Sequence, residues 1–444
     1  MRRLAERYAT PVPRYTSYPT APNFGPTVGA REAAQWIALL PDDAHLSLYM
    51  HIPFCRALCW YCGCATTVVN GHQPIASYVE TLATEMARVA ELVPPRHSVS
   101  HIHWGGGSPN SLTADEIKAL AIRTRELFRI DPAAEFAVEI DPRFMDTGRV
   151  AALQEAGVNR ISIGVQDFDP KVQAAINRHQ PYDKTRQVVS DLRGAGLTSL
   201  NIDLVYGLPG QTQNSVARTV DLVLALNPDR IAVFGYAHLP DKIRHQRLID
   251  TAALAGPTER LGQANRIARI LLANGYVRVG LDHFAKPGDP MAHAAVKRNF
   301  QGYTTDVADA LIGFGASAIS RFPQGYTQNA PRTPDYQNRI AERGLATVRG
   351  LALSEDDRIR AYVIERLMCD LTFSEGDLRT QFGTKAESLI EEARALPEAD
   401  QDGLIASTSD GFHVTERGRP FVRSICACFD TYYDQSAGRH AAGV

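Results

Sequence analysis

Residues 48–64 are LYMHIPFCRALCWYCGC, and this stretch decides the fold. It begins with an apolar run that ends at a proline, which is typical of a buried strand. A loop with the spacing Cys-x3-Cys-x2-Cys-x-Cys follows at once, and its cysteines are Cys55, Cys59, Cys62 and Cys64. Such a group of thiols in one short loop indicates a metal or catalytic centre rather than a disulfide framework.

Two kinds of metal centre fit this loop. Three thiolates can each bind one iron of a [4Fe–4S] cube and leave the fourth iron open for catalysis. Zinc is the alternative, because four cysteines can bind it tetrahedrally. Structural zinc sites usually join two separated knuckles, however, and Cys426-x-Cys428 is a poor second one. We therefore favour an iron–sulfur cluster, with zinc or inert buried thiols as the alternatives.

The chain as a whole has the composition of an ordinary globular protein. It has 444 residues, 44% of them hydrophobic, and a formal charge of 47 − 49 = −2. That balance provides no electrostatic footprint for nucleic acid or for an acidic membrane surface. No apolar run approaches the roughly 18 residues that cross a bilayer, and the N-terminus lacks the apolar stretch of a signal peptide. We expect a soluble, cytoplasmic protein of two or three domains.

Strand-like and helix-like segments alternate from Leu46 to about Ala285. This alternation predicts βαβ units on a parallel sheet, and six or seven units fit an α/β fold with a partial TIM-like barrel. The predicted strands are 46–53, 101–105, 136–141, 160–166, 199–206, 230–236 and 276–283, and the predicted helices between them are 75–92, 114–128, 147–155, 182–193, 215–226 and 259–273.

The segments outside the barrel predict further parts of the molecule. Prolines recur through residues 1–45 and favour an extended arm rather than a helix. Residues 46–349 would form the barrel and its extension. Helices at 354–369, 375–382 and 385–395, then a hairpin of 403–408 and 412–415, predict a winged-helix-like domain over residues 350–435. The small, polar segment 436–444 would be a loose tail.

Polar residues follow the strands of the predicted barrel. Glu139, Gln166, Asp203 and the pair Tyr236-Ala237 end the third to sixth predicted strands, and Trp104-Gly105-Gly106-Gly107-Ser108-Pro109 follows the second. Glycines there would let the backbone approach a ligand closely, although an ordinary tight turn is the alternative. Each polar residue alone could be a cap or turn residue, but together they predict one active-site mouth.

These features resemble the radical S-adenosylmethionine (SAM) superfamily, in which Cys-x3-Cys-x2-Cys follows the first strand of a βα barrel. Over nearly the whole chain the sequence is similar to the oxygen-independent coproporphyrinogen III oxidases (dehydrogenases) of heme biosynthesis. The segments that carry this resemblance are 13–20, 49–55, 62–64, 103–107, 139–143, 164–168, 201–209, 236–240, 282–285, 298–303 and 426–430.

The resemblance implies a role for individual residues. Cys55, Cys59 and Cys62 would ligate the [4Fe–4S] cluster, whose open iron would bind SAM. The contacts of that SAM would be Tyr49, Gly106, Glu139 and Ile319. The contacts of a second SAM would be Tyr61, Gly107, Ser108, Gln166, Arg178, Asp203 and Ala237. Cys64 would lie near the reacting centre, with Cys64 and Glu139 as catalytic residues, and Phe300 and Gln301 would border the substrate.

The implied reaction is the oxidative decarboxylation of two propionates of coproporphyrinogen III to the vinyl groups of protoporphyrinogen IX. A radical derived from SAM would remove hydrogen from the carbon next to the ring. Because the substrate is tetra-anionic, Arg14 and Arg298 are candidate partners, although either could instead form a surface ion pair. The resemblance also implies an electron donor such as flavodoxin or ferredoxin, and we expect a monomer without nucleic-acid or membrane partners.

Other functions have to be weighed against this one. A heme chaperone shares the radical SAM core but lacks the Cys62-Gly63-Cys64 pattern, the segment 298–303 and the arm segment 15–20, all of which are present here. A heme-degrading radical methyltransferase would use the same cluster. A winged-helix interaction protein with a structural zinc belongs to a different class, and it predicts zinc and no SAM cleavage.

Overall fold

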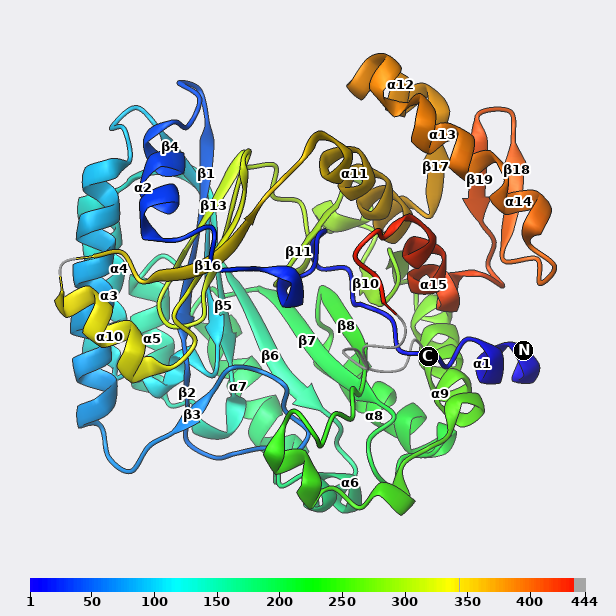
Figure 1. Ribbon diagram of the computed structural model, residues 1–444. Coiled ribbons are helices and arrows are strands. Elements are labelled where there is room, and N and C mark those ends of the chain that lie inside the picture. The colour runs from blue at the N-terminus through cyan, green and yellow to red at the C-terminus, as the bar shows by residue number, and fades with distance from the viewer. Residues whose placement is uncertain (343, 435–444) are drawn as a thin grey trace.

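The computed structural model describes residues 1–342 and 344–434. Its centre is a twelve-stranded sheet in the order β16-β15-β14-β13-β1-β4-β5-β6-β7-β8-β10-β9. The strands from β13 to β8 in this order run parallel to one another, and the strands beyond them are antiparallel to their neighbours. The two edges of the sheet do not pair with each other, so the barrel is partial, as predicted (Figure 1).

Most of the parallel strands and their helices lie where the sequence predicts them, but the strand predicted at 136–141 begins at Arg129, and the helix Pro170–Ala175 was not predicted. The strands are β1 (His45–Ile52), β4 (Ser98–Gly106), β5 (Arg129–Ile140), β6 (Arg160–Gln166), β7 (Ser199–Tyr206) and β8 (Arg230–Gly235). The helices that follow the strands are α3 (Gln73–Leu92), α4 (Ala114–Leu127), α5 (Thr147–Glu155), α6 (Pro170–Ala175), α7 (Tyr182–Gly194), α8 (Gln213–Leu226) and α9 (Pro257–Ala273).

The seventh predicted strand, 276–283, is wrong as a parallel barrel strand. The structure has two short antiparallel strands there, β9 (Val277–Val279) and β10 (His283–Ala285). Gly280 interrupts the run with a φ of 57°, a conformation that favours glycine, and the chain turns back on itself. The opposite edge is extended by β13 (Ala310–Phe314), β14 (Ile319–Phe322), β15 (Gly325–Asn329) and β16 (Thr347–Ala352), with α10 (Thr333–Ala341) between the last two.

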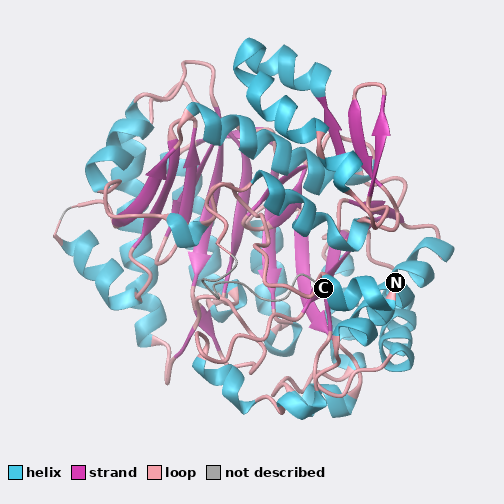
Figure 2. Ribbon diagram, turned by 45° about the vertical axis from the view of Figure 1, so that its right-hand side comes forward, coloured by secondary structure: helices cyan, strands magenta, loops and turns pink. Residues whose placement is uncertain are grey.

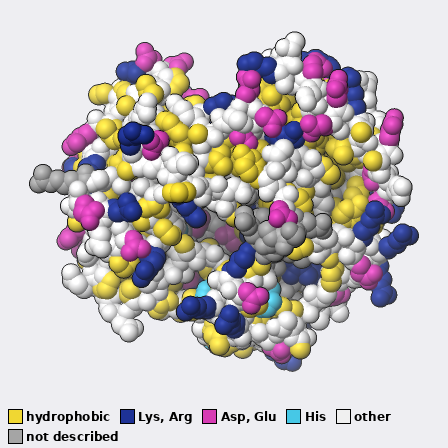
Figure 3. Space-filling model, in the orientation of Figure 1, with side chains coloured by type: hydrophobic (Ala, Val, Ile, Leu, Met, Phe, Trp, Pro, Cys, Tyr) yellow, Lys and Arg dark blue, Asp and Glu magenta, His cyan; other side chains and the backbone are white. Residues whose placement is uncertain are grey.

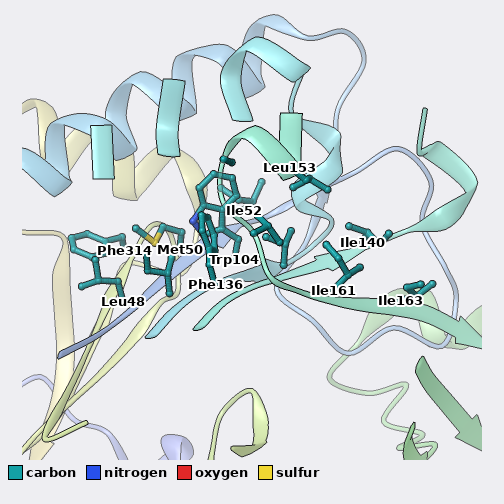
Figure 4. Close-up of a cluster of buried hydrophobic side chains, with 14 of the residues drawn as sticks. Leu48, Met50, Ile52, Trp104, Phe136, Ile140, Leu153, Ile161, Ile163 and Phe314 are labelled. Atoms are coloured by element: carbon teal, nitrogen blue, oxygen red, sulfur yellow. The ribbon is translucent and has the colours of Figure 1, made fainter. Parts of the chain in front are cut away.

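Side chains on the barrel strands alternate between two environments. Those that point outward are apolar and pack under the helices, with Trp104 fully buried at the centre of the labelled group in Figure 4. The alternate residues of the same strands point to the inside of the barrel and are polar: Ser47, Tyr49, His51, His101, His103, Glu139, Ser162, Asn201 and Asp203. Closed TIM barrels fill this space with branched apolar side chains, so a polar interior is typical of a binding site rather than of a packed core.

The C-terminal domain has the element order expected of a winged-helix module. Its three-stranded sheet has the order β17-β19-β18. The elements are α11 (Glu355–Asp370), β17 (Thr372–Ser374), α12 (Glu375–Phe382), α13 (Glu387–Arg394), α14 (Leu396–Ala399), β18 (Ile405–Thr408), β19 (Gly411–Val414) and α15 (Val422–Cys426). The predicted tail, 436–444, lies outside the described residues.

The N-terminal arm is less extended than predicted. It contains α1 (Arg2–Arg7) and α2 (Ala30–Ala38), because the prolines cluster between these two segments and leave both free to form helices. The proline-rich middle packs on the C-terminal domain: Tyr15 Oη donates to Asp430 at 3.1 Å, and Tyr433 Oη donates to the Pro11 carbonyl at 2.7 Å. The start of the chain therefore lies beside the C-terminal domain (Figure 2).

Acidic and basic side chains are mixed over the face shown in Figure 3, which agrees with the small net charge. No helix of the described part of the chain is long and apolar enough to span a membrane.

Candidate active site

The cysteine loop leaves the carboxyl end of β1 and is tied to its surroundings by the backbone. Cys55 lies in the short strand β2 (Phe54–Cys55), which pairs with β3 (Thr67–Val68). The Trp60 amide donates to the Ile176 carbonyl at 3.0 Å, and the Cys62 amide donates to the Cys59 carbonyl at 3.2 Å. All four cysteines are free thiols. The loop is thus held at the barrel mouth, as its place in the sequence predicted.

Two arginines make the environment of the cysteines suitable for thiolates. Arg143 Nη2 and Arg178 Nη1 lie 3.4 and 3.5 Å from Cys59 Sγ and donate to it. Asp141 holds both arginines, at 2.6 Å from Arg143 and 3.3 Å from Arg178. Cations near sulfur favour its ionised form, which is the form that binds metal.

Cys62 and Cys64 differ sharply although they are close neighbours. A hydrogen bond from the Cys64 side chain lowers the pKa of the Cys62 thiol to about 6, whereas its partner Cys64 has its pKa raised. His245 Nε2 is hydrogen-bonded to the Cys62 carbonyl at 2.7 Å and adds to the stabilisation. Cys62 is therefore the more readily ionised of the two thiols, and Cys64 keeps its proton beside it.

The donor set fits a cluster better than a single ion. Among the described residues, no three cysteine, histidine or carboxylate side chains are arranged around one point as a single metal ion needs. A cube spreads its ligands, one thiolate on each of three irons. Burial raises the pKa of Cys55 to about 12, with Cys62 and Cys59 adding to the rise, so binding of iron at Cys55 has to displace a proton.

Two hydrogen-bonded pairs line the inside of the barrel below the cysteines. The Tyr49 hydroxyl is 3.0 Å from His51 Nδ1, and His51 Nε2 is 3.0 Å from the Ala65 carbonyl in the cysteine loop. On the next strands, His103 Nε2 is 3.0 Å from Glu139 Oε1. Burial would raise the pKa of Glu139, but the hydrogen bond and charge of His103, together with the Gly106 amide and His51, outweigh it, and the pKa is lowered. Glu139 is therefore an anion in the cavity.

A second carboxylate, Asp203, lies further round the barrel. It accepts hydrogen bonds from Ser162 Oγ at 3.0 Å and from Asn201 Nδ2 at 2.8 Å. Burial, with the nearby Glu139, raises its pKa to about 6. Gln166 is the last residue of β6 and has a φ of 71°, so the strand stops there. The side chain of Gln166 turns back toward Gly164. Arg178 donates to the Gly164 carbonyl at 2.6 Å.

The three glycines after β4 face groups of the chain itself. A Cβ on Gly105 would lie 2.8 Å from the Glu139 carboxyl, and one on Gly106 would lie 2.6 Å from the His51 ring. One on Gly107 would lie 2.7 Å from the Phe54 carbonyl oxygen. The glycines therefore bring β4, Glu139 and the cysteine loop together, whereas the sequence prediction assigned them to the approach of a ligand.

The remaining candidate cofactor residues come from separate elements. Ser108 donates to Asn110, which in turn donates to the Asp141 carbonyl at 2.9 Å. Gln246 Nε2 donates to the carbonyls of Tyr61 and Ala237, at 3.0 Å each, and so joins two predicted contacts. Ile319 begins β14, and its carbonyl lies against Gly313, the residue that pairs with Tyr49.

The four candidate substrate residues occupy different positions. Gln301 borders a cavity inside the barrel together with His101 and His103, whereas Phe300 is exposed and contacts Tyr326 edge-on. The Arg298 side chain is only 6% exposed and lies 3.6 Å from Asp282, so a surface ion pair is wrong for it. Arg14 is exposed and donates to the Gly235 carbonyl at 3.1 Å.

Several supporting residues were not assigned roles from the sequence. His103, Asp141 and Arg143 lie inside segments that carried the family resemblance, so the signal was present without an indication of what each residue contacts. Gln246 and His245 had no signal at all, because they lie in a loop that approaches the cysteines only through the fold.

Comparisons with known proteins agree with this geometry. A family model described as the radical SAM superfamily matches residues 49–223, and one described as the HemN C-terminal domain matches residues 353–421. The chain is 47% identical to an oxygen-independent coproporphyrinogen III oxidase from Bradyrhizobium diazoefficiens, covering 98% of this chain and 97% of that one. For the enzyme of the same name from Escherichia coli the identity is 40%, with 98% and 96% covered.

A solved structure extends the similarity to the fold. Coproporphyrinogen III oxidase from Escherichia coli, described as a radical SAM enzyme, matches with a TM-score of 0.90 at 40% identity. The match covers 95% of this chain and 98% of that one. These three relatives all carry the name of the oxidase, so the chaperone and methyltransferase alternatives are not favoured.

Proposed function

Because the chain belongs to the radical SAM superfamily and, within it, to the family of oxygen-independent coproporphyrinogen III oxidases, we propose that it converts coproporphyrinogen III to protoporphyrinogen IX in heme biosynthesis. The substrate is that of the family, by the names of its relatives. The observation that carries the proposal is the thiol loop at the mouth of a polar partial barrel, with Glu139 and Asp203 facing inward. The enzyme is an oxidoreductase that depends on SAM.

Cys55, Cys59 and Cys62 are the proposed ligands of the [4Fe–4S] cluster. When bound, the cluster and SAM supply a carbon-centred radical that can remove hydrogen from an unactivated carbon. Arg143 and Arg178 offset the negative charge of the thiolates. The family resemblance assigns Glu139, Tyr49, Gly106 and Ile319 to the SAM at the cluster, and a buried carboxylate such as Glu139 suits the amino group and hydroxyls of that ligand.

A second SAM is proposed beside the first. Asp203 on β7 can accept hydrogen bonds from the hydroxyl groups of that ligand. The positive charge of Arg178, which donates a hydrogen bond to Gly164 of the neighbouring β6, can pair with the carboxylate of the ligand. Gln246 fixes the backbone at two of the other proposed contacts. The full set is Tyr61, Gly107, Ser108, Gln166, Arg178, Asp203 and Ala237.

Cys64 is proposed to act at the reacting centre. Its hydrogen bond to Cys62, together with the charges of Cys62 and Glu139, raises the pKa of its thiol. It therefore stands close to both a proposed cluster ligand and a proposed SAM contact, and it keeps its proton. This position supports a role for Cys64, with Glu139, as a catalytic residue.

The proposed reaction removes one hydrogen from the propionate carbon next to the ring. The resulting substrate radical is stabilised by the pyrrole, then loses CO2 and passes one electron to a one-electron acceptor, and the vinyl group remains. Gln301, which lines a cavity of the barrel together with His103, is the proposed contact of the ring. A low-potential carrier such as flavodoxin or ferredoxin would reduce the cluster, and the seven free cysteines suit the reducing cytoplasm.

The parts of the chain divide this function among them. Residues 46–349 are the proposed catalytic barrel with its extension, and residues 350–435 are the proposed C-terminal domain. Residues 1–45 serve as an arm that covers the active site, supported by the contact of Arg14 with the end of β8. A single chain is the proposed working unit.

The first prediction concerns iron. Protein purified without oxygen and reconstituted with iron and sulfide should hold about four irons per chain, with the visible absorbance of a [4Fe–4S] cluster. Iron, sulfide and zinc are measured on the same sample. Stoichiometric zinc without visible absorbance would refute the cluster assignment and restore the zinc alternative.

The second prediction tests the reaction itself. With coproporphyrinogen III, SAM and a strong reductant under anaerobic conditions, the reconstituted protein should form protoporphyrinogen IX, methionine and 5′-deoxyadenosine. Porphyrins are quantified by chromatography after oxidation, and a reaction without SAM is the control. Transfer of heme without decarboxylation would instead indicate a chaperone.

A further inference from the structure

Four arginines from separate parts of the chain meet at the carboxyl ends of β7 and β8. Arg260 lies 5.7 Å over the ring of Tyr206, the last residue of β7, and donates to the Tyr236 carbonyl at 2.9 Å. Arg14 donates to Gly235, the last residue of β8. The arm, α9, β11 (Lys297–Asn299) and α15 supply one residue each to this arginine cluster: Arg14, Arg260, Arg298 and Arg423.

Arg423 and Arg298 lie close to the other members of the arginine cluster. Burial lowers the pKa of Arg423 to about 10, and the charges of Arg14 and Arg298 act in the same direction. Arg298 lies 4.5 Å over the ring of Tyr303. Its Nε and Nη1 are buried and make no hydrogen bond to any described residue.

The carboxylate beside Arg298 does not satisfy that arginine. Asp282 lies 3.6 Å from Arg298 Nη1, which is too long for a hydrogen bond, and Asp282 is also shared with His283, at 2.8 Å from its Nδ1. Burial would raise the pKa of Asp282, but the charge of Arg298, the hydrogen bond and charge of His283 and the charge of Arg14 together outweigh the burial, so this carboxyl stays ionised. Buried guanidinium donors without an acceptor are costly. The cluster is therefore suited to a carboxylate or phosphate that a ligand brings.

The proposed reaction gives the carboxylates of the substrate two different fates. Two propionates lose their carboxylate as neutral CO2, and two remain unchanged. A guanidinium group stabilises a carboxylate more than it stabilises the departing CO2, so an ion pair at a reacting propionate would raise the barrier. At a propionate that does not react, the same ion pair contributes binding and orientation at no cost to the rate.

We propose that the arginine cluster of Arg14, Arg260, Arg298 and Arg423 binds the propionates that the reaction leaves in place. This inference rests on the proposed function and extends it, because it separates the site that anchors the ring from the site that decarboxylates it. The alternative source of the same chemistry is the carboxylate of a second SAM near Ala237, two residues after Gly235.

The test compares the binding of two porphyrinogens that differ in their carboxylates. Coproporphyrinogen III carries four propionates, and protoporphyrinogen IX carries only the two that are retained. Dissociation constants are measured without reductant, so that no turnover occurs, for the reconstituted wild type and for Arg298→Gln. Loss of a charge-assisted hydrogen bond should weaken the binding of both porphyrinogens by about tenfold or more and by the same factor, while the dissociation constant of SAM stays unchanged.

Matched variants make the result specific. Arg298→Lys keeps the charge and should recover part of the affinity, and Arg417→Gln removes an exposed arginine of the C-terminal domain and should bind like the wild type. If Arg298→Gln fails to fold, Arg14→Gln, which changes an exposed side chain of the arm, replaces it. The inference is overturned if only coproporphyrinogen III binds more weakly, because the cluster would then hold reacting propionates. Weaker binding of SAM alone, or of neither ligand, also overturns it. A wild type that binds neither porphyrinogen would overturn the proposed function as well.

Discussion

Cys62→Ala abolishes reductive cleavage of SAM while the protein remains folded. Cys62 is a readily ionised thiol of the loop, with a pKa lowered to about 6. Without it, a second iron of the cluster would have no cysteine ligand. The loss of a residue that only supports a metal ligand costs about 10- to 100-fold, so loss of the ligand itself should exceed that range. Formation of 5′-deoxyadenosine by reconstituted protein, with the iron content of the same sample, provides the measurement.

The exposed Cys428 is the matched control for this prediction. Cys428→Ala also removes one thiol, but from the C-terminal domain, and both iron content and SAM cleavage should equal those of the wild type. Circular dichroism of both variants should match the wild type, since the loop is held by backbone hydrogen bonds that alanine retains. Retained cleavage in Cys62→Ala would remove Cys62 from the ligand set and favour Cys64 in its place.

The alternation of strands and helices predicted the barrel because each unit follows local rules. Strands β6 and β7 have the predicted bounds, 160–166 and 199–206, since both alternate apolar outward residues with inward ones between clear turn signals. The segment 276–283 failed because Gly280 divides an otherwise continuous strand pattern. The prediction of an extended arm failed at α2, because residues 30–38 contain no proline and are free to form a helix.

The sequence predicts those parts of the site in which a polar residue stands at or near the end of a strand. Glu139 and Asp203 were found in this way, and the structure places both on the inner side of the barrel strands, where burial and then the charge of Glu139 raise the pKa of Asp203. The polar alternation of Ser47, Tyr49 and His51 in β1 is a further sequence signal for this interior. Arg423 could not be found, because its approach to Arg14 depends on how the C-terminal domain packs on the arm. Long-range packing of this kind has no local sequence pattern.

Gly107→Ala should weaken both the fold and the cluster site. A Cβ there would lie 2.7 Å from the Phe54 carbonyl oxygen and 2.8 Å from Phe54 N, both backbone atoms that cannot rotate away. The cysteine loop would have to move, and with it the hydrogen bond of the Gly107 amide to the Ile52 carbonyl, 2.8 Å long, and that of the Ser108 amide to Phe54. Overpacking together with the loss of these bonds should lower the free energy of unfolding by about 2–4 kcal/mol.

Gly194→Ala is the control that separates this contact from the general effect of replacing glycine. Gly194 ends α7, and a Cβ there would meet no atom of the described chain within 4 Å, so its free energy of unfolding should stay equal or rise by up to about 1 kcal/mol. Denaturation in urea under reducing conditions compares the two variants, and iron reconstitution follows on each. If Gly107→Ala unfolds like Gly194→Ala and binds the same amount of iron, the close approach of β4 to the cysteine loop does not hold the site together. If only Gly107→Ala loses stability and bound iron, the missing side chain of this glycine is what allows the cysteine loop to lie where Cys55 and its neighbours face the barrel.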